Sequence, residues 1–354
     1  MKISLAKESA ESKAYGIGLD IIRIIAMFFV IMLHSTSFFG FKIEGIHSFV
    51  TAIAGAGRYL SYSCVPLFLL LTGYLSINKK PELSYYLKLI KILIEFYVCA
   101  FAVAIFYTTY TNGSDSFFNM MSRASVLVFP SYSWYMRMYI GLFFLAPFFN
   151  YIINSITNKQ AMLLCVVSVI LFSNPFILDF WQWGYPIMYY FIGATVRKTQ
   201  FKAKKAYCIV TLPIASALGV LLYKYPKVPR FDIENYNNLV CVVIAVSLFL
   251  LLYDVKCDTT RTCGRRLCKL ARQIANVSMS TYLVSVIFES LTDRFFLKLE
   301  LVTFTERFPH LLYLTPIKFG LSIICALLIH FVSSYIIKLV MLIIEKILSQ
   351  RKRA

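Results

Sequence analysis

The chain has 354 residues, of which 59% are hydrophobic, and its mean hydropathy is +0.70. Soluble domains contain about 45–50% apolar residues, so this composition excludes an ordinary soluble fold. The formal net charge is +19, from 36 Lys and Arg against 17 Asp and Glu. Because long apolar runs recur along the chain, basic loops on the cytoplasmic side explain this surplus. We therefore expect the lipid bilayer as a partner, and no nucleic acid.

The chain begins with a polar, charged segment, residues 1–15, which lacks the short apolar stretch and cleavage site of a signal peptide. We interpret it as a cytoplasmic tail, with a second, basic cytoplasmic tail at residues 347–354. The apolar runs between them lack the period-two alternation of a membrane barrel, which predicts an all-α polytopic transmembrane helix bundle. About ten spans are predicted, at residues 17–40, 47–77, 86–110, 134–155, 161–178, 183–197, 207–223, 237–254, 274–292 and 312–346.

The distribution of basic residues predicts the orientation of the bundle. With the N-terminus inside, most of the 36 Lys and Arg residues fall in segments on the cytoplasmic side. This is the bias that orients polytopic proteins in membranes. An even number of spans also returns the C-terminus to the cytoplasm, so both termini are predicted to be cytoplasmic.

The first predicted span contains an arginine and a histidine, Arg23 and His34. Charged and ionisable residues in a membrane-length segment are costly and usually face a protein interior or a cavity. Eleven residues make about three helical turns, so both side chains lie on one face, about 16 Å apart. Arg23 lies toward the cytoplasm and suits a phosphate-bearing ligand, whereas His34 suits proton abstraction from a hydroxyl. Alternatively, Arg23 snorkels and pairs with Asp20, while His34 caps a helix end.

Other polar residues also lie within or beside predicted spans. Arg58, Arg137 and Glu289 are predicted near the outer face, where they form either a polar pocket for a glycan or structural ion pairs. The sequence does not assign a role to Arg137 and Glu289, nor to Glu95 and Lys318. Aromatic residues at the start of the fourth span, Trp134 and Tyr135, suit sugar stacking and interface anchoring equally well.

Nine cysteines are scattered along the chain, most of them in apolar runs. Cys257, Cys263 and Cys268 cluster in a basic loop but lack a CxxC pair and a nearby histidine. Structural zinc sites normally show such spacing, so we expect no metal site.

Six segments, taken in order, resemble the membrane acyltransferase 3 family. Arg23, ten intervening residues and His34, preceded by LDII, resemble its first-span signature. The other five are residues 65–75 (VPLFLLLTGYL), 85–92 (YYLKLIKI), 133–147 (SWYMRMYIGLFFLAP), 189–193 (YYFIG) and 277–283 (VSMSTYL). The resemblance covers nearly the whole chain and implies one integral-membrane acyltransferase domain over residues 1–354.

The chain departs from the family pattern at three positions. Ser285 replaces a histidine that many members have in the ninth span, and Tyr132 stands near a histidine that often precedes the fourth-span tryptophan. Arg137 is an additional charge in the fourth span. None of the three alters the Arg23–His34 pair.

The resemblance implies O-acyl transfer, usually of acetyl from cytoplasmic acetyl-CoA to a hydroxyl of a surface polysaccharide or lipid-linked glycan. It also implies a bacterial cytoplasmic membrane. In this interpretation His34 and Arg23 are catalytic, with His34 deprotonating or otherwise assisting the acceptor hydroxyl. Arg23 and two lysines, Lys88 and Lys91, contact coenzyme A. Four further residues are expected to bind the acceptor: Arg58, Trp134, Tyr135 and Arg137.

Two other classes of function remain open at this stage. One is a multi-pass transporter or flippase of glycans or lipid intermediates, which the absence of internal repeats and of broken helix pairs disfavours. The other is a non-catalytic regulator that kept the fold, suggested by the missing ninth-span histidine.

Overall fold

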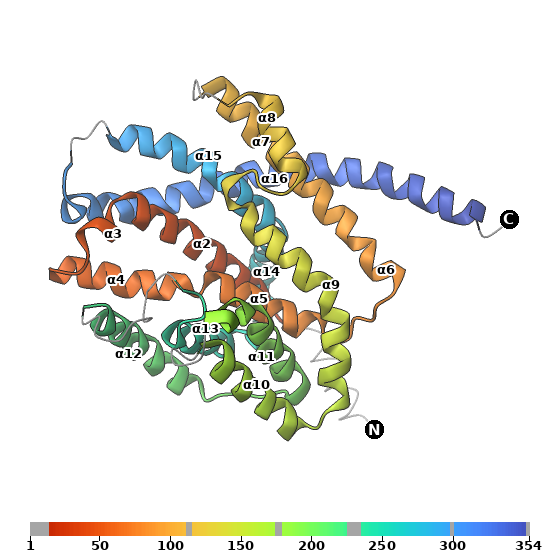
Figure 1. Ribbon diagram of the computed structural model, residues 1–354, viewed down its shortest axis with the longest axis horizontal. Helices are drawn as coiled ribbons and strands as arrows, with labels where there is room; N and C mark the ends of the chain where they lie inside the picture. Colours follow the sequence, from red (N-terminus) through yellow and green to blue (C-terminus); the bar gives the residue numbers. More distant parts are fainter. Residues whose placement is uncertain (1–13, 111–114, 174–178, 225–234, 298–300, 352–354) are drawn as a thin grey trace.

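The computed structural model describes residues 14–110, 115–173, 179–224, 235–297 and 301–351. These residues are almost entirely helical, which confirms the predicted all-α class (Figure 1). A small two-stranded antiparallel ladder joins β1 (Ala14–Tyr15) to β2 (Cys257–Asp258). Most of the predicted N-terminal tail, residues 1–13, lies outside the described residues.

The helices follow one another with short connections. In the first half of the chain they are α2 (Gly18–Phe38), α3 (Phe41–Glu44), α4 (Phe49–Tyr62), α5 (Cys64–Ser76), α6 (Leu83–Tyr86), α7 (Lys88–Tyr110), α8 (Phe117–Ser125) and α9 (Trp134–Ser155). In the second half they are α10 (Asn158–Ser173), α11 (Tyr185–Thr199), α12 (Lys205–Lys224), α13 (Leu239–Leu252), α14 (Thr262–Asn276), α15 (Ser278–Leu297) and α16 (Phe304–Arg351). Two 3-10 turns, η1 (Ser131–Ser133) and η2 (Asp179–Gly184), precede α9 and α11.

Each predicted span corresponds to one or more helices, but not every helix is long enough to cross a bilayer. Within the described residues, six helical segments are long and apolar enough, and the number rises to seven if the bent pair α14–α15 is counted as one span. The count of ten is therefore not confirmed. The difference lies in α10, α11 and α13, which have 16, 15 and 14 residues. A straight crossing needs about 20 residues.

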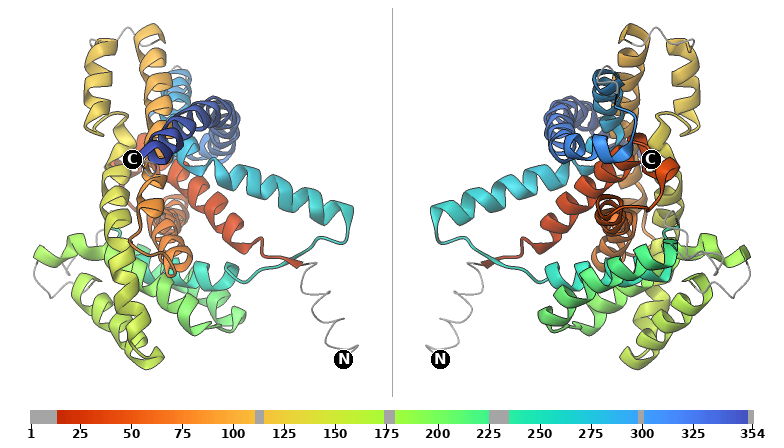
Figure 2. Two further views of the ribbon diagram at one scale, coloured as in Figure 1. Left: turned by 90° about the vertical axis from the view of Figure 1, so that its right-hand side faces the viewer. Right: turned by 90° about the vertical axis from the view of Figure 1, so that its left-hand side faces the viewer.

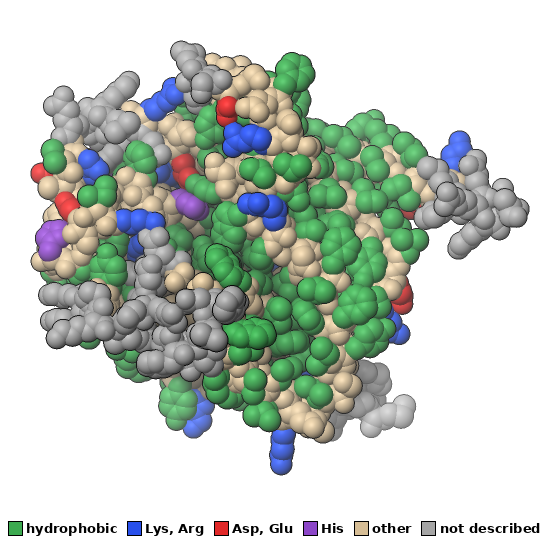
Figure 3. Space-filling model, viewed as in Figure 1, with side chains coloured by type: hydrophobic (Ala, Val, Ile, Leu, Met, Phe, Trp, Pro, Cys, Tyr) green, Lys and Arg blue, Asp and Glu red, His purple; other side chains and the backbone are tan. Residues whose placement is uncertain are grey.

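The interior of the bundle is formed around α5, and the periphery includes α12 and α16. The segment Phe49–Ser76 contains α4 and α5, and 72% of its most apolar stretch is buried. In α16 only 11% of the most apolar stretch is buried. Large apolar side chains of α16, such as Leu328 and Phe331, are exposed. Hydrophobic side chains likewise cover much of the surface in Figure 3. An apolar exterior of this extent is expected of a protein solvated by lipid rather than water.

Two glycines allow α5 and α11 to pack closely. A Cβ atom at Gly73 would collide with the backbone of Tyr190, and one at Gly193 would collide with the backbone of Leu70. Small residues at such crossings bring helix backbones together where lipid gives no hydrophobic driving force. The α5–α11 contact therefore depends on both glycines.

Replacing Gly193 by alanine is expected to weaken this contact, because the added methyl group meets rigid backbone. Overpacking of a well-packed interior typically lowers the free energy of unfolding by about 1–3 kcal/mol. Thermal unfolding of the purified protein in detergent measures the effect as a lower melting temperature. Gly141→Ala in α9 is the matched control, because no atom lies within 4 Å of its added Cβ. Equal melting temperatures for the two variants would contradict the packing described here.

Candidate functional site

The first long helix, α2, carries Arg23 and His34 on one continuous face. Arg23 Nη1 donates a hydrogen bond to Asp20 Oδ1 at 3.0 Å, one turn before it. Met27 and Val30 lie between Arg23 and His34 at the three- and four-residue spacing of one helix face. The pairing with Asp20 does not withdraw Arg23 from the interior, because its side chain still borders a cavity.

A cavity of about 340 Å³ extends along this face of α2. Its lining residues on α2 are Arg23, Met27 and Val30, and its other walls come from α5, α7, α9 and α15. The volume lies at the lower end of the range for small-molecule sites, about 300–1,000 Å³. The walls are largely apolar and aromatic, and the polar groups among them include Arg23, Glu95 and Thr72.

Three stacked rings connect the cavity to His34. Tyr282 lines the cavity, and its ring stacks on that of Tyr132 with centroids 5.3 Å apart. The Tyr132 ring stacks in turn on the imidazole of His34, with centroids 4.2 Å apart. His34 lies one turn beyond Val30, so the two tyrosine rings stand between the cavity and the imidazole.

A buried polar cluster surrounds His34 at the C-terminal part of α2. The Tyr132 hydroxyl donates a hydrogen bond to Glu289 Oε2, and Ser285 Oγ donates one to Glu289 Oε1 at 3.4 Å. Lys318, which is only 1% exposed, donates from Nζ to Ser35 Oγ at 3.3 Å. Buried ionisable groups of this kind need partners, and the partners of Glu289 and Lys318 come from η1, α15 and α2.

The guanidinium of Arg58 holds α4 against the last turns of α2. Arg58 is only 1% exposed. Its Nη1 donates hydrogen bonds to Leu33 O at 3.1 Å, Thr36 Oγ1 at 2.7 Å and Ser37 Oγ at 2.9 Å. The guanidinium also lies over the ring of Tyr62, 5.5 Å from its centroid. These contacts make Arg58 a structural support of the α2 segment that carries His34.

The carboxyl group of Glu95 occupies another wall of the cavity. It accepts a hydrogen bond from the Ser280 hydroxyl of α15, and Nδ1 of His330 lies 3.7 Å from Glu95 Oε1. Contacts from α15 and α16 therefore fix the orientation of the carboxyl group, which borders the same cavity as Arg23.

The two lysines expected to contact the donor lie at the beginning of α7. Both Lys88 and Lys91 are exposed. Lys88 lies four residues before Ile92 and seven before Glu95, so it shares the face of α7 that lines the cavity. Lys91 lies four residues before Glu95.

The structure separates the three α9 residues that were expected to bind the acceptor. Tyr135 lines the cavity, whereas the Trp134 ring stacks on Tyr236 with centroids 5.8 Å apart. Arg137 is exposed and is not among the residues that line the cavity. Tyr135 is thus the α9 residue that the fold brings to Arg23.

Sequence reasoning missed that the rings of Tyr132 and Tyr282 stand between the cavity and His34. It also assigned no role to Glu289. Tyr132 was noted only as a departure from a histidine, yet it touches both His34 and Glu289. Tyr132 and Glu289 are 157 residues apart in the chain, and helix periodicity cannot reveal such a contact. The available signal was that Tyr132 and Ser285 stand near positions where the family often has histidines.

The fold and the site together define a polytopic helical membrane protein with an internal cavity and a buried polar centre beside it. Residues 17–338 match the family model described as an acyltransferase domain. The chain therefore belongs to the acyltransferase 3 family and is a membrane acyltransferase. The searches of curated proteins and of solved structures found no match.

The contacts of Arg58 predict a large effect on stability. Arg58→Met is expected to lower the free energy of unfolding by more than about 3 kcal/mol, because hydrogen bonds to charged groups contribute about 1.5–3 kcal/mol each. Arg137→Met removes the same charge from an exposed position and is expected to change stability by less than about 0.5 kcal/mol. Melting temperatures of the two purified variants test this difference. A wild-type melting temperature for Arg58→Met would show that these hydrogen bonds do not support α2.

Proposed function

We propose that this protein transfers an acetyl group from cytoplasmic acetyl-CoA to a hydroxyl group of a surface polysaccharide or lipid-linked glycan. The observation that carries the proposal is the cavity along α2, which begins at Arg23 and leads toward His34. Such a cavity is what a donor needs if its thioester is to approach an imidazole three turns deeper than its phosphates. The bacterial cytoplasmic membrane is the location that suits this donor and acceptor.

The two ends of the cavity suit the two ends of the donor. Coenzyme A has a charged nucleotide end and a long, thin arm that carries the thioester. The arm fits among the apolar and aromatic residues of the cavity, whereas its phosphates would remain near the beginnings of α2 and α7. There Arg23 offers forked donors, and Lys88 and Lys91 offer positive charge.

His34 would act on the acceptor hydroxyl. The imidazole takes the hydroxyl proton, the acceptor oxygen attacks the acetyl carbonyl carbon, and the carbon–sulfur bond breaks. The proton then passes from the imidazole to the departing thiolate, so that the products are the acetyl ester and coenzyme A. Lys318 contacts Ser35, the residue after His34, and its positive charge would stabilise the negative charge that develops on the carbonyl oxygen.

This reaction requires the stacked rings to move. Because Tyr132 and Tyr282 stand between the cavity and His34, the thioester reaches the imidazole only after these side chains change rotamer. The acceptor would approach on the other side of the rings. Trp134, at the beginning of α9, is a partly exposed aromatic ring that could contact a sugar, and it stacks on Tyr236.

Substitution of His34 tests the proposal directly. His34→Ala is expected to lower kcat for acetyl transfer by at least about 100-fold, the lower range for losing a general acid–base group. Arg23→Gln is expected chiefly to raise KM for acetyl-CoA, since it removes a phosphate contact. Both constants can be measured with labelled acetyl-CoA and isolated glycan acceptor in membranes that contain equal amounts of protein.

His310→Ala is the matched control, because His310 is outside the buried cluster and pairs with the Tyr313 hydroxyl at 2.7 Å. It is expected to keep wild-type activity. Glycan acetylation that persists at the wild-type level in His34→Ala would remove His34 from the reaction.

A further inference from the structure

The short helix α14 is bent sharply away from the helix that follows it. The axes of α14 and α15 differ by 68° at the break between Asn276 and Ser278. Transmembrane helices tilt by about 20° on average, so α14 would lie within roughly 40° of the membrane plane if α15 crosses the bilayer. In Figure 2 α14 projects sideways from the bundle and runs beside the beginning of α2. It therefore has the placement of a surface helix rather than of a second half of a span.

One face of α14 is already occupied by the protein. Cys268 and Ala271 are buried and form a small apolar cluster with Ile17, against which Ile21 and Ile24 of α2 also pack. These contacts fix the rotation of α14 about its own axis. The sides of the helix that remain exposed therefore have a defined direction.

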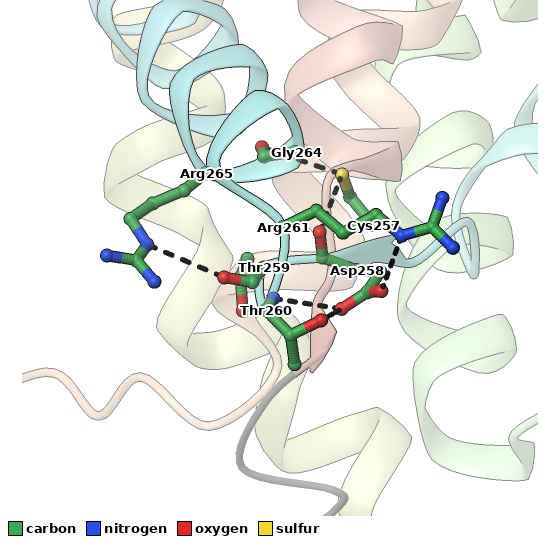
Figure 4. Close-up of polar contacts among 7 residues, drawn as sticks. All are labelled: Cys257, Asp258, Thr259, Thr260, Arg261, Gly264 and Arg265. Carbon is green, nitrogen blue, oxygen red and sulfur yellow. Dashed lines mark hydrogen bonds and ion pairs between the residues drawn. The ribbon is translucent and has the colours of Figure 1, made fainter.

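The turn before α14 fixes the beginning of the helix (Figure 4). Asp258 accepts hydrogen bonds from the amide and hydroxyl of Thr260, and these hold the pKa of its carboxyl group below the usual range. Arg261 lies 3.9 Å from the same carboxylate, and Arg265 Nε donates to Thr259 O at 3.5 Å. Asp258 also belongs to β2, so the turn is connected to the strand before α2.

The exposed part of α14 has a basic side and an apolar side. At about 100° per residue, the four basic residues within α14 fall in an arc of about 120°. Leu267 and Leu270 lie on the other side of the helix and are 55% and 54% exposed. The four basic residues, all exposed, are Arg265, Arg266, Lys269 and Arg272, and the exposed Arg261 lies directly before the helix.

We propose that α14 lies on the membrane surface where α2 and α15 begin, and binds anionic phospholipid headgroups through this basic side. Leu267 and Leu270 enter the boundary between headgroups and acyl chains, and the arginine and lysine side chains reach the phosphates. A bilayer offers an apolar layer and an anionic layer side by side, which matches the two exposed sides of one helix. The bend at Asn276 keeps the basic side and the apolar side of α14 at the depth of the headgroups.

Hydrogen exchange of the purified full-length chain tests the proposal. The protein is placed in nanodiscs of phosphatidylcholine alone, or of phosphatidylcholine mixed with phosphatidylglycerol, and the exchange rate of amides in residues 262–276 is measured. Each basic residue near an anionic surface increases affinity about fivefold. We therefore expect exchange to slow by at least about tenfold in the anionic nanodiscs, and raised salt to reverse the change.

Variants that remove positive charge test whether the slowing depends on α14 itself or on the general positive charge of this side of the protein. The variant with Arg265→Gln, Arg266→Gln, Lys269→Gln and Arg272→Gln is expected to lose the slowing in anionic nanodiscs. The matched control removes four exposed lysines elsewhere, with Lys79→Gln, Lys80→Gln, Lys202→Gln and Lys204→Gln, and is expected to keep it. If the fourfold α14 variant does not fold, Arg265→Gln with Lys269→Gln is used and is expected to lose most of the effect.

Three results would overturn the proposal. The first is an exchange rate that is the same in both nanodiscs for the wild-type chain. The second is an equal loss of slowing in the control variant, which would indicate unspecific attraction. The third is slowing by free coenzyme A in phosphatidylcholine nanodiscs as large as that by anionic lipid, which would make the basic side a nucleotide-phosphate site.

Discussion

The structure depends on how one apolar helix keeps its ionisable residues partnered inside a membrane-length bundle. Asp20 pairs with Arg23 at one end of α2, and Tyr132 covers the His34 ring near the other. Arg58 satisfies polar atoms in the last turns of α2, and Lys318 reaches Ser35 from α16. An unpartnered polar group in such surroundings costs several kcal/mol, so these contacts determine which helices must surround α2.

The same constraint explains why the cavity and the polar centre are adjacent but separate. The cavity wall is largely apolar and aromatic, whereas the cluster around His34 is dense with hydrogen bonds. Stacked tyrosine rings suit the boundary, because each has an apolar face and a hydroxyl that needs a partner. The Tyr132 hydroxyl finds Glu289, and the Tyr282 hydroxyl donates to Tyr132 O at 2.8 Å.

The sequence predicted the helices from its long apolar runs and the shared face of Arg23 and His34 from helical periodicity, because both are local properties of one segment. It also placed Lys88 correctly near the start of a long helix. It could not foresee that Arg58 turns inward while Arg137 stays exposed, since that depends on helix rotation within the bundle. The count of ten included α10, α11 and α13 because their segments are apolar, although the helices are shorter than a straight crossing needs.

Two departures from the family pattern acquire a common explanation in three dimensions. Tyr132 and Ser285 stand near positions where histidines are frequent in the family, and both hydroxyls donate to the single carboxyl group of Glu289. A ring N–H of a histidine and a hydroxyl group can each donate to a carboxylate, so the hydroxyls of Tyr132 and Ser285 provide the kind of contact that histidines at these positions could make with Glu289. The three residues therefore form one hydrogen-bonded unit, and its outer member, Tyr132, is the residue that stacks on His34. In this chain the partner of the first-span histidine is an aromatic ring oriented by a carboxyl group, so the missing histidines do not by themselves indicate a lost active site.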